Sequence, residues 1–374
     1  MKFMSGLSAY KRNGLWKVIP SGLITLLFGS LYALLEWGIL GSAGFYPSTG
    51  NAYSFFNQFV LVVPSSFFLG AGVALIEIFV FDRLFESKTF IVKVFVKSLV
   101  YVLIILVFLI FGASVVNAQN TNQPIFSPQV LDSLLLFLSS KALIGILLYI
   151  GAVITVVLFV NEVFDYFGRR VSLAYTFGKY HTPKQESRIF MFMDLKSSTT
   201  IAEQLGHVTY FKWINQYYRD ITEYILESKG DIYQYVGDEI IVTWDMDKGL
   251  ENERCLECFY RIKKGMDKKA HEYIDRFGVV PQFKAGVHIG EVTTGEIGMI
   301  KKDIIYSGDV LNTTARIQAS CNSYGYDLLV SDRIAAAFHG LPNYQFQSLG
   351  VIYLRGKAKS VGLYAVESRI DQNE

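Results

Sequence analysis

The chain has 374 residues, of which 51% are apolar and only 18% are charged, and its formal net charge is +2. This length allows two or more domains, and the apolar excess, which is concentrated in residues 1–160, excludes an entirely soluble protein. The near-neutral charge gives no support for nucleic-acid binding, and three cysteines are too few to indicate a disulfide framework.

Four apolar segments are long enough to cross a membrane as helices, which needs about 20 residues each. They are residues 17–40, 57–81, 92–116 and 134–160. We therefore predict an all-α transmembrane bundle of four helices over residues 1–160. A cleaved signal peptide is the rival interpretation of the first segment, but its apolar region is too long for one. Glu36 and Glu77 fall toward helix ends, so a functional role and a solvated role both stay open.

Basic residues predict the orientation of these helices. The connections 41–56 and 117–131 contain no Lys or Arg, whereas the other flanks carry Lys2, Lys11, Arg12, Lys17, Arg83, Lys88, Lys93, Lys97, Arg169, Arg170 and Lys179. The positive-inside rule then places both termini in the cytoplasm. Lys141 is an exception, because it falls toward the outer side of the fourth helix, where its side chain can extend to the interface.

Residues 161–184 connect the two halves. Their first part can continue the fourth helix into the cytoplasm, and Pro183 marks its stop. This connector is the natural element for transmitting a change in the membrane half.

The second half, residues 185–370, alternates short strands and helices, which favours a mixed sheet covered by helices. The strand "RIFMFMD" ends in Asp194 and is followed by a helix that can be capped by Ser197, Ser198 or Thr199 and continues past Gly206 to about Lys229. The stretch "YQYVGDEIIVTW", residues 233–244, reads as a hairpin with its turn at Gly237-Asp238. Further elements are expected near 249–277 (helix), 282–289 and 303–306 (strands) and 310–321 (helix). Cys255 and Cys258 are expected to pack inside the first of these helices, because a zinc site needs a second ligand pair.

Two aspartates are predicted to converge at one edge of this sheet. Asp194 ends a strand and Asp238 lies at the tip of a hairpin that can pair beside it. Two neighbouring carboxylates repel each other, and Mg²⁺ or Mn²⁺ carrying phosphates relieves that repulsion. Backbone N–H groups in the loop "LKSST" can receive an anion. Either aspartate alone fits a helix cap or a turn, but the pair favours a two-metal site for phosphoryl or nucleotidyl transfer.

A second group of polar residues lies in "YSGDVLNTTARIQ", residues 306–318. Asn312 and Arg316 are four residues apart and share one helix face. Such an Arg can neutralise charge on a phosphate, and such an Asn can orient a sugar. Asp309 is expected to be the N-cap of this helix.

The segments "FMDLKSST", "YVGDEIIV", "GVHIGEVTTGEIG" and "GDVLNTTARIQ", in this order, resemble the class III adenylate/guanylate (nucleotidyl) cyclase domain. The resemblance implies an α+β ferredoxin-like, palm-type domain that forms a head-to-tail homodimer with active sites at the interface. It also implies two Mg²⁺ or Mn²⁺ ions per active site and conversion of a nucleoside triphosphate to a 3′,5′-cyclic nucleotide and pyrophosphate.

The resemblance also assigns roles to residues. Asp194, Asp238 and the backbone carbonyl of Leu195 match the metal ligands. Asn312 matches the ribose-orienting Asn and Arg316 the transition-state Arg, both acting on the metals of the partner chain. Arg355 or Lys357 falls near the triphosphate-binding Lys of the family.

Two positions that read the base in this family depart from its usual patterns. Gln234 stands where adenylate cyclases commonly have Lys and guanylate cyclases Glu, and Ile305 stands where Asp or Thr, or Cys, is usual. A Gln amide can both donate and accept, whereas Ile can do neither. We expect weak base selectivity or a base read by backbone groups, with adenine favoured and guanine or a pyrimidine open.

Three functions compete. A membrane-anchored homodimeric cyclase that makes cyclic AMP is favoured. A diguanylate cyclase is suggested by "VGDEI" alone, and "NTTAR" has no counterpart in that group. A catalytically degenerate membrane receptor is disfavoured, because decay should strike the metal or transition-state residues and all four are intact.

Overall fold

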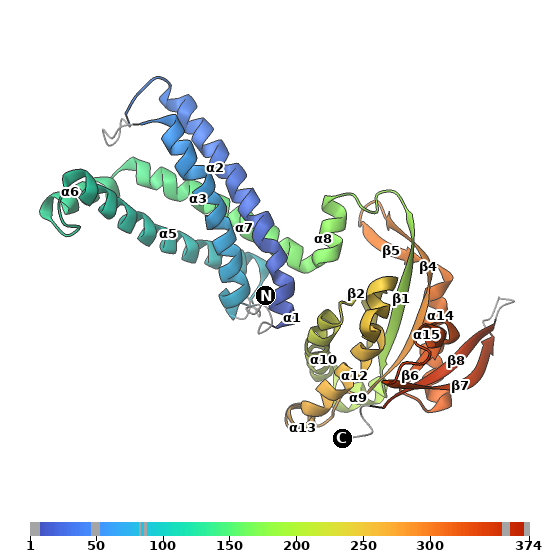
Figure 1. Cartoon of the computed structure of the whole chain (residues 1–374). Coiled ribbons are helices and arrows are strands. Elements are labelled where there is room, and N and C mark those ends of the chain that lie inside the picture. The colour runs from blue at the N-terminus through green and yellow to red at the C-terminus, as the bar shows by residue number, and fades with distance from the viewer. Residues whose placement is uncertain (1–7, 46–52, 82–83, 86–87, 354–359, 370–374) are drawn as a thin grey trace. The chain divides into compact units, whose positions relative to one another are not determined.

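The computed structural model describes residues 8–45, 53–81, 84–85, 88–353 and 360–369 (Figure 1). The chain divides into two compact units: an all-helical one, Lys11–Arg169, and one that comprises Met1–Tyr10 and Arg170–Glu374 and is built on a sheet. The predicted fold class, a helical bundle followed by an α+β domain, is confirmed.

Within the described residues, four helices are long and apolar enough to cross a membrane, by length and composition. They comprise α1 (Ala9–Gly14), η1 (Leu15–Lys17) and α2 (Val18–Leu40), then α3 (Phe55–Ile76) with the π-helical turn η2 (Glu77–Phe81), then α5 (Phe90–Thr121), and finally α7 (Lys141–Phe167). The fourth begins later than the predicted residue 134, because a separate helix, α6 (Pro128–Leu138), precedes it. Ser140 caps α7 by accepting from Leu143 N at 3.3 Å.

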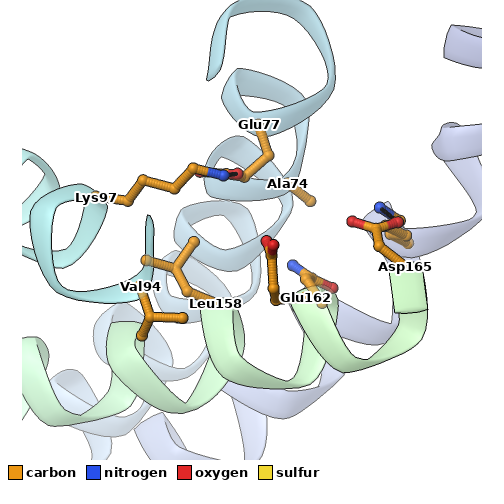
Figure 2. A pocket seen from close by; sticks show the side chains of 9 residues that line it. Ala74, Glu77, Val94, Lys97, Leu158, Glu162 and Asp165 are labelled. Carbon is orange, nitrogen blue, oxygen red and sulfur yellow. Dashed lines mark hydrogen bonds and ion pairs between the residues drawn. The ribbon is translucent and has the colours of Figure 1, made fainter. Parts of the chain in front are cut away.

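Helix α7 carries polar side chains that pair with other helices of this unit near one end (Figure 2). Glu162 accepts from Lys93 of α5 at 2.7 Å, Asp165 pairs with Lys17, and Asn161 donates to Ser21 of α2 at 3.1 Å. Because buried charges are costly unless they are paired, these contacts hold α7 in one register against α2 and α5.

A further ion pair completes this polar cluster. Glu77 of η2 pairs with Lys97 of α5 and also accepts from the Tyr101 hydroxyl at 3.0 Å. Glu77 and Lys97 line a cavity of about 10 Å³ together with polar side chains of α7. That is room for about one water molecule, so the cluster is packed for internal pairing rather than for a ligand.

Reversing one charge of the Lys93–Glu162 pair is expected to destabilise the helical unit. Lys93→Glu or Glu162→Lys alone places like charges together in a buried position and should lower the free energy of unfolding by about 3 kcal/mol. The double exchange, K93E/E162K, should recover most of that loss in thermal melts of the protein in nanodiscs. Lys88→Glu, at a neighbouring exposed lysine, is the control. A double exchange no more stable than the worse single variant would contradict the pairing.

The second unit is built on one mixed sheet with the order β2-β3-β1-β4-β6-β8-β7, and β5 pairs with β4. Strands β4 and β6 run parallel and the other described pairs are antiparallel. The strands are β1 (Lys184–Leu195), β2 (Asp231–Val236), β3 (Glu239–Asp245), β4 (Phe283–Ile297), β5 (Asp303–Ser307), β6 (Leu328–Ser331), β7 (Tyr344–Tyr353) and β8 (Ser360–Ser368).

Helices cover this sheet and connect its strands (Figure 1). They are α9 (Ser198–Leu205), α10 (His207–Glu227), α11 (Met246–Leu250), η3 (Glu251–Glu253), α12 (Arg254–Lys268), α13 (Ala270–Phe277), α14 (Asp309–Tyr324) and α15 (Asp332–Ala337). Helix α8 (Arg169–Thr176) precedes β1 and is part of the connector. The predicted continuous helix over 197–229 is therefore wrong: Gly206 adopts φ +72° and ψ +157°, which ends α9 and starts α10.

Alternation along β1 sets which face of the sheet each residue meets. Met191 and Met193 are fully buried in the core that includes α10 and α12. Phe190 and Phe192 pack on the other face, in a cluster with Val310 of α14. Each such buried side chain contributes about 1.5–3 kcal/mol. Because side chains alternate, the next even-numbered position, Asp194, faces α14.

Candidate active site

The structure brings Asp194, Asp238 and Glu239 together. Asp194 lies opposite Glu239 in the β1–β3 register, and Asp238 precedes Glu239 in the turn after Gly237, whose φ is +64°. Burial and the charge of Asp238 raise the pKa of Asp194. Burial, followed by the charges of Asp194 and Asp238, raises the pKa of Glu239 to about 7. Three carboxyl groups so close together concentrate negative charge at this edge of the sheet, and a bound cation would relieve it.

Glu239 is not among the residues that the sequence predicts for this group. The antiparallel register explains why Glu239 lies beside Asp194. Glu239 is the first residue of β3 after the turn, and it pairs with Asp194 near the end of β1. Knowing which residue of β1 pairs with the hairpin would have been enough to find it.

Two further polar residues contact Asp194 and were also missed. Lys284 of β4 is its cross-strand neighbour and places Nζ 3.3 Å from Asp194 Oδ2. Gln318 of α14 donates Nε2 to the same oxygen at 3.1 Å. Neither could be found from the sequence, because β4 and α14 are separated from β1 by about ninety residues or more along the chain.

The donor set fits Mg²⁺ or Mn²⁺ bound together with a phosphate. Among the described residues, no group of three His, Cys, Asp or Glu side chains is arranged to hold a metal by itself. Asp194 and Asp238 supply two hard carboxylates, and Mg²⁺ is typically held by one or two carboxylates with waters and substrate phosphates as the other ligands.

The loop that follows β1 holds the other predicted residues of this edge. Leu195 ends β1, and Ser197 has left-handed backbone angles of φ +55° and ψ +27° immediately before α9. Ser197, one of the three predicted caps, is the N-cap residue of α9, but its side chain makes no capping hydrogen bond. Ser198 and Thr199 open α9, where backbone N–H groups point out of the helix.

Asn312 and Arg316 lie on α14, Asn312 exposed and Arg316 half-buried. The predicted N-cap role of Asp309 is wrong. Gly308 is the N-cap, because its extended backbone carries β5 directly into the helix, and Asp309 is the first helical residue, accepting from Thr313 Oγ1 at 3.1 Å.

Gln234 and Ile305 are each next in the chain to a tyrosine, and these two tyrosines contact each other. Tyr233 of β2 and Tyr306 of β5 have ring centroids 4.8 Å apart, and Tyr306 N donates to the Tyr233 hydroxyl at 3.4 Å. Gln234 is exposed beside a bulge in the β2–β3 pairing, and Ile305 is half-buried. Arg355 and Lys357 lie outside the described residues.

A cavity of about 650 Å³ lies beside Asp238. Helix α10 and strand β2 line it, mainly with the aromatic and apolar side chains of Tyr210, Phe211, Ile214, Tyr218 and Tyr235. Phe211 is 69% exposed and Tyr235 47%. An exposed apolar surface of this kind next to acidic residues is typical of a binding or association face.

Residues 179–368, which contain all the elements of this site, match the family model described as the adenylate and guanylate cyclase catalytic domain. The chain belongs to this family. The resemblance inferred from the four sequence segments is thereby confirmed.

Relatives of this cyclase-family chain include two bacterial adenylate cyclases. "Adenylate cyclase 2" of Rhizobium meliloti is 29% identical over 223 residues, which cover 60% of this chain and 61% of the relative. The adenylate cyclase of Anabaena cylindrica is 23% identical over 185 residues, covering 48% of this chain and 36% of the relative. The chain thus spans less than two thirds of the length of these relatives.

A solved structure of a bacterial light-regulated adenylyl cyclase has the same fold. It superposes with a TM-score of 0.50 at 18% identity, covering 58% of this cyclase-family chain and 64% of the other.

Proposed function

We propose that this chain is a membrane-anchored nucleotidyl cyclase that converts a nucleoside triphosphate, preferentially ATP, to the 3′,5′-cyclic nucleotide and pyrophosphate. The observation that carries the proposal is the convergence of Asp194 and Asp238 at one edge of the sheet, in a domain that also presents Asn312 and Arg316 on α14. Membership of the cyclase family and the names of the bacterial relatives support the same reaction.

Each residue has a distinct role in this proposal. Asp194, Asp238 and the Leu195 carbonyl hold two Mg²⁺ or Mn²⁺ ions. When bound, these ions would favour ionisation of the ribose 3′-hydroxyl and neutralise charge on the triphosphate. Backbone N–H groups of residues 197–199 receive phosphate oxygens, as does Arg355 or Lys357.

The remaining residues act on the sugar and on the reacting phosphate. Asn312 hydrogen-bonds the ribose and so aligns the 3′-oxygen with the α-phosphate. Arg316 donates to the phosphate oxygens on which negative charge grows.

The active enzyme in this proposal is a homodimer that pairs the Asp194–Asp238 edge of one copy with α14 of the other. Asn312 is exposed, as an interface residue must be in the separate chain. The apolar cavity beside Asp238, with exposed Phe211 and Tyr235, offers a face for a second copy.

In this proposal residues 1–160 anchor the protein in the bilayer, with both termini in the cytoplasm. Residues 161–184 form the connector, and residues 185–370 form the catalytic domain in the cytoplasm. The connector has a physical route to the site. Arg170 of α8 donates to Asp231 of β2 at 3.1 Å, and its guanidinium lies 5.4 Å from the ring centroid of Tyr306 of β5. Those strands carry Gln234 and Ile305.

Base preference tests the proposal most directly. Full-length protein in nanodiscs with Mn²⁺ should convert ATP to cyclic AMP and pyrophosphate. GTP should also be turned over, at a rate within about a hundredfold of the rate for ATP, because Ile305 cannot hydrogen-bond a base and so cannot reject guanine strongly. Products of all four nucleoside triphosphates should be identified by mass spectrometry. A cyclic dinucleotide would point to the diguanylate cyclase alternative, and no turnover to the degenerate receptor.

A further inference from the structure

The Asp194 carboxylate is held by two buried side chains that belong to neither predicted group of site residues. Gln318 Nε2 donates to Asp194 Oδ2 at 3.1 Å, and Lys284 Nζ lies 3.3 Å from the same oxygen. Gln318 is 6% exposed and Lys284 8%. Buried donors of this kind keep their partners, so they fix the orientation of Asp194 and engage one of its two oxygens. Both donors lie on Oδ2, so the proposed cation is expected at the other oxygen, Oδ1.

This arrangement is anchored on α14. Gln318 and Asn322 are four residues apart on that helix and so lie on one face. Lys284 of β4 donates to Asn322 Oδ1 of α14 at 3.2 Å and also contacts Asp194 of β1, so its side chain links these three elements. The same helix carries Arg316, two residues before Gln318.

We propose that Gln318 is a positioning residue for the cation that Asp194 binds in its own chain. This assignment rests on the proposed function. Hydrogen-bond partners of a metal ligand orient it, and their loss typically weakens metal binding by about tenfold or more. Lys284 takes part in the same contact but is a poorer probe, because its removal also changes the charge near the cation.

In the proposed dimer, one α14 helix therefore serves two active sites. Gln318 orients the Asp194 of its own chain, whereas Arg316 completes the site of the partner. The position of Gln318 two residues from Arg316 creates an alternative, in which Gln318 acts by placing Arg316. The experiment therefore has to distinguish an effect of Gln318 on the Asp194 of its own chain from an effect on the site that Arg316 completes in the partner chain.

The first measurement is Mn²⁺ binding by electron paramagnetic resonance to the full-length chain in detergent. Gln318→Met, similar in size but without the donor, should raise the Kd for Mn²⁺ about tenfold. Ser320→Ala is the matched control, because Ser320 Oγ bonds Arg316 O at 2.8 Å within the same helix and does not involve Asp194. A Kd for the Gln318 variant within about twofold of the control overturns the inference. If Asp194→Ala also leaves the Kd unchanged, the proposed metal site itself fails.

The second measurement uses mixed dimers of full-length chains carrying Asp238→Ala and chains carrying Arg316→Ala, in which only one active site has all its residues. Adding Gln318→Met to the Arg316→Ala chain, which supplies the metal ligands, should raise the Mn²⁺ concentration for half-maximal turnover about tenfold. Adding it to the Asp238→Ala chain should leave that concentration unchanged. The opposite pattern would show that Gln318 acts through Arg316 and would refute the assignment. Because both arms contain the same substitution, a general loss of stability affects them equally and cannot produce the difference.

Discussion

Asp238→Ala is expected to lower turnover by about a thousandfold or more, because a metal ligand supplies several kcal/mol of charge stabilisation in the transition state. Asp194→Asn should have a similar effect. This variant keeps an oxygen that can accept from Gln318 and Lys284, so neither buried donor is left without an acceptor. Turnover of full-length variants by cyclic nucleotide release is the measurement.

The fold should survive both changes. The folded state raises the pKa values of Asp194 and Glu239, which means that it disfavours their ionised forms. Removing one carboxylate relieves that repulsion, so the melting temperature without metal should be equal to or higher than that of the wild type. Asp247→Ala, at an exposed acid that follows the same hairpin, is the control and should retain full turnover. More than about a tenth of wild-type turnover in either site variant would contradict the metal assignment.

Two inactive chains should regain activity when they are mixed. Chains carrying Asp238→Ala retain Arg316, and chains carrying Arg316→Ala retain both aspartates. If each site takes its metals from one copy and its Arg from the other, a mixed dimer has one complete site. Random pairing makes about half of the dimers mixed, so the recovered activity should be about a quarter of the wild-type value.

Complementation of this kind separates a shared site from a site contained in one chain. Differently tagged chains should be co-expressed, and the mixed dimer purified through both tags before assay. Mixed dimers that form and remain as inactive as the parents would rule out the exchange of α14 between copies. A mixture of Asp194→Asn with Asp238→Ala chains provides the control, because both lesions then fall on the same side of each site.

Local signals in the sequence were enough for much of this architecture. Four apolar segments predicted four long helices, and the structure has them. Gly237-Asp238 between apolar runs predicted the hairpin of β2 and β3, and Gly237 indeed adopts a positive φ. Two local predictions are wrong: the helix expected to continue past Gly206 ends there, and Gly308 rather than Asp309 is the N-cap of α14. Both errors concern a single backbone angle that the side chains on either side do not determine.

The sequence alone indicated the cyclase family, which the family model confirms, and it predicted the two-part organisation and the four residues on which the proposed chemistry depends, because period, turn residues and motif order are local properties. Only the tertiary structure decided that Glu239, Lys284 and Gln318 surround Asp194, and that Glu162 and Asp165 pair with lysines of other helices. Those contacts depend on strand register and helix packing between segments up to 148 residues apart. Register and packing are fixed by the combined burial of many side chains from distant segments, so no short stretch of sequence predicts these contacts.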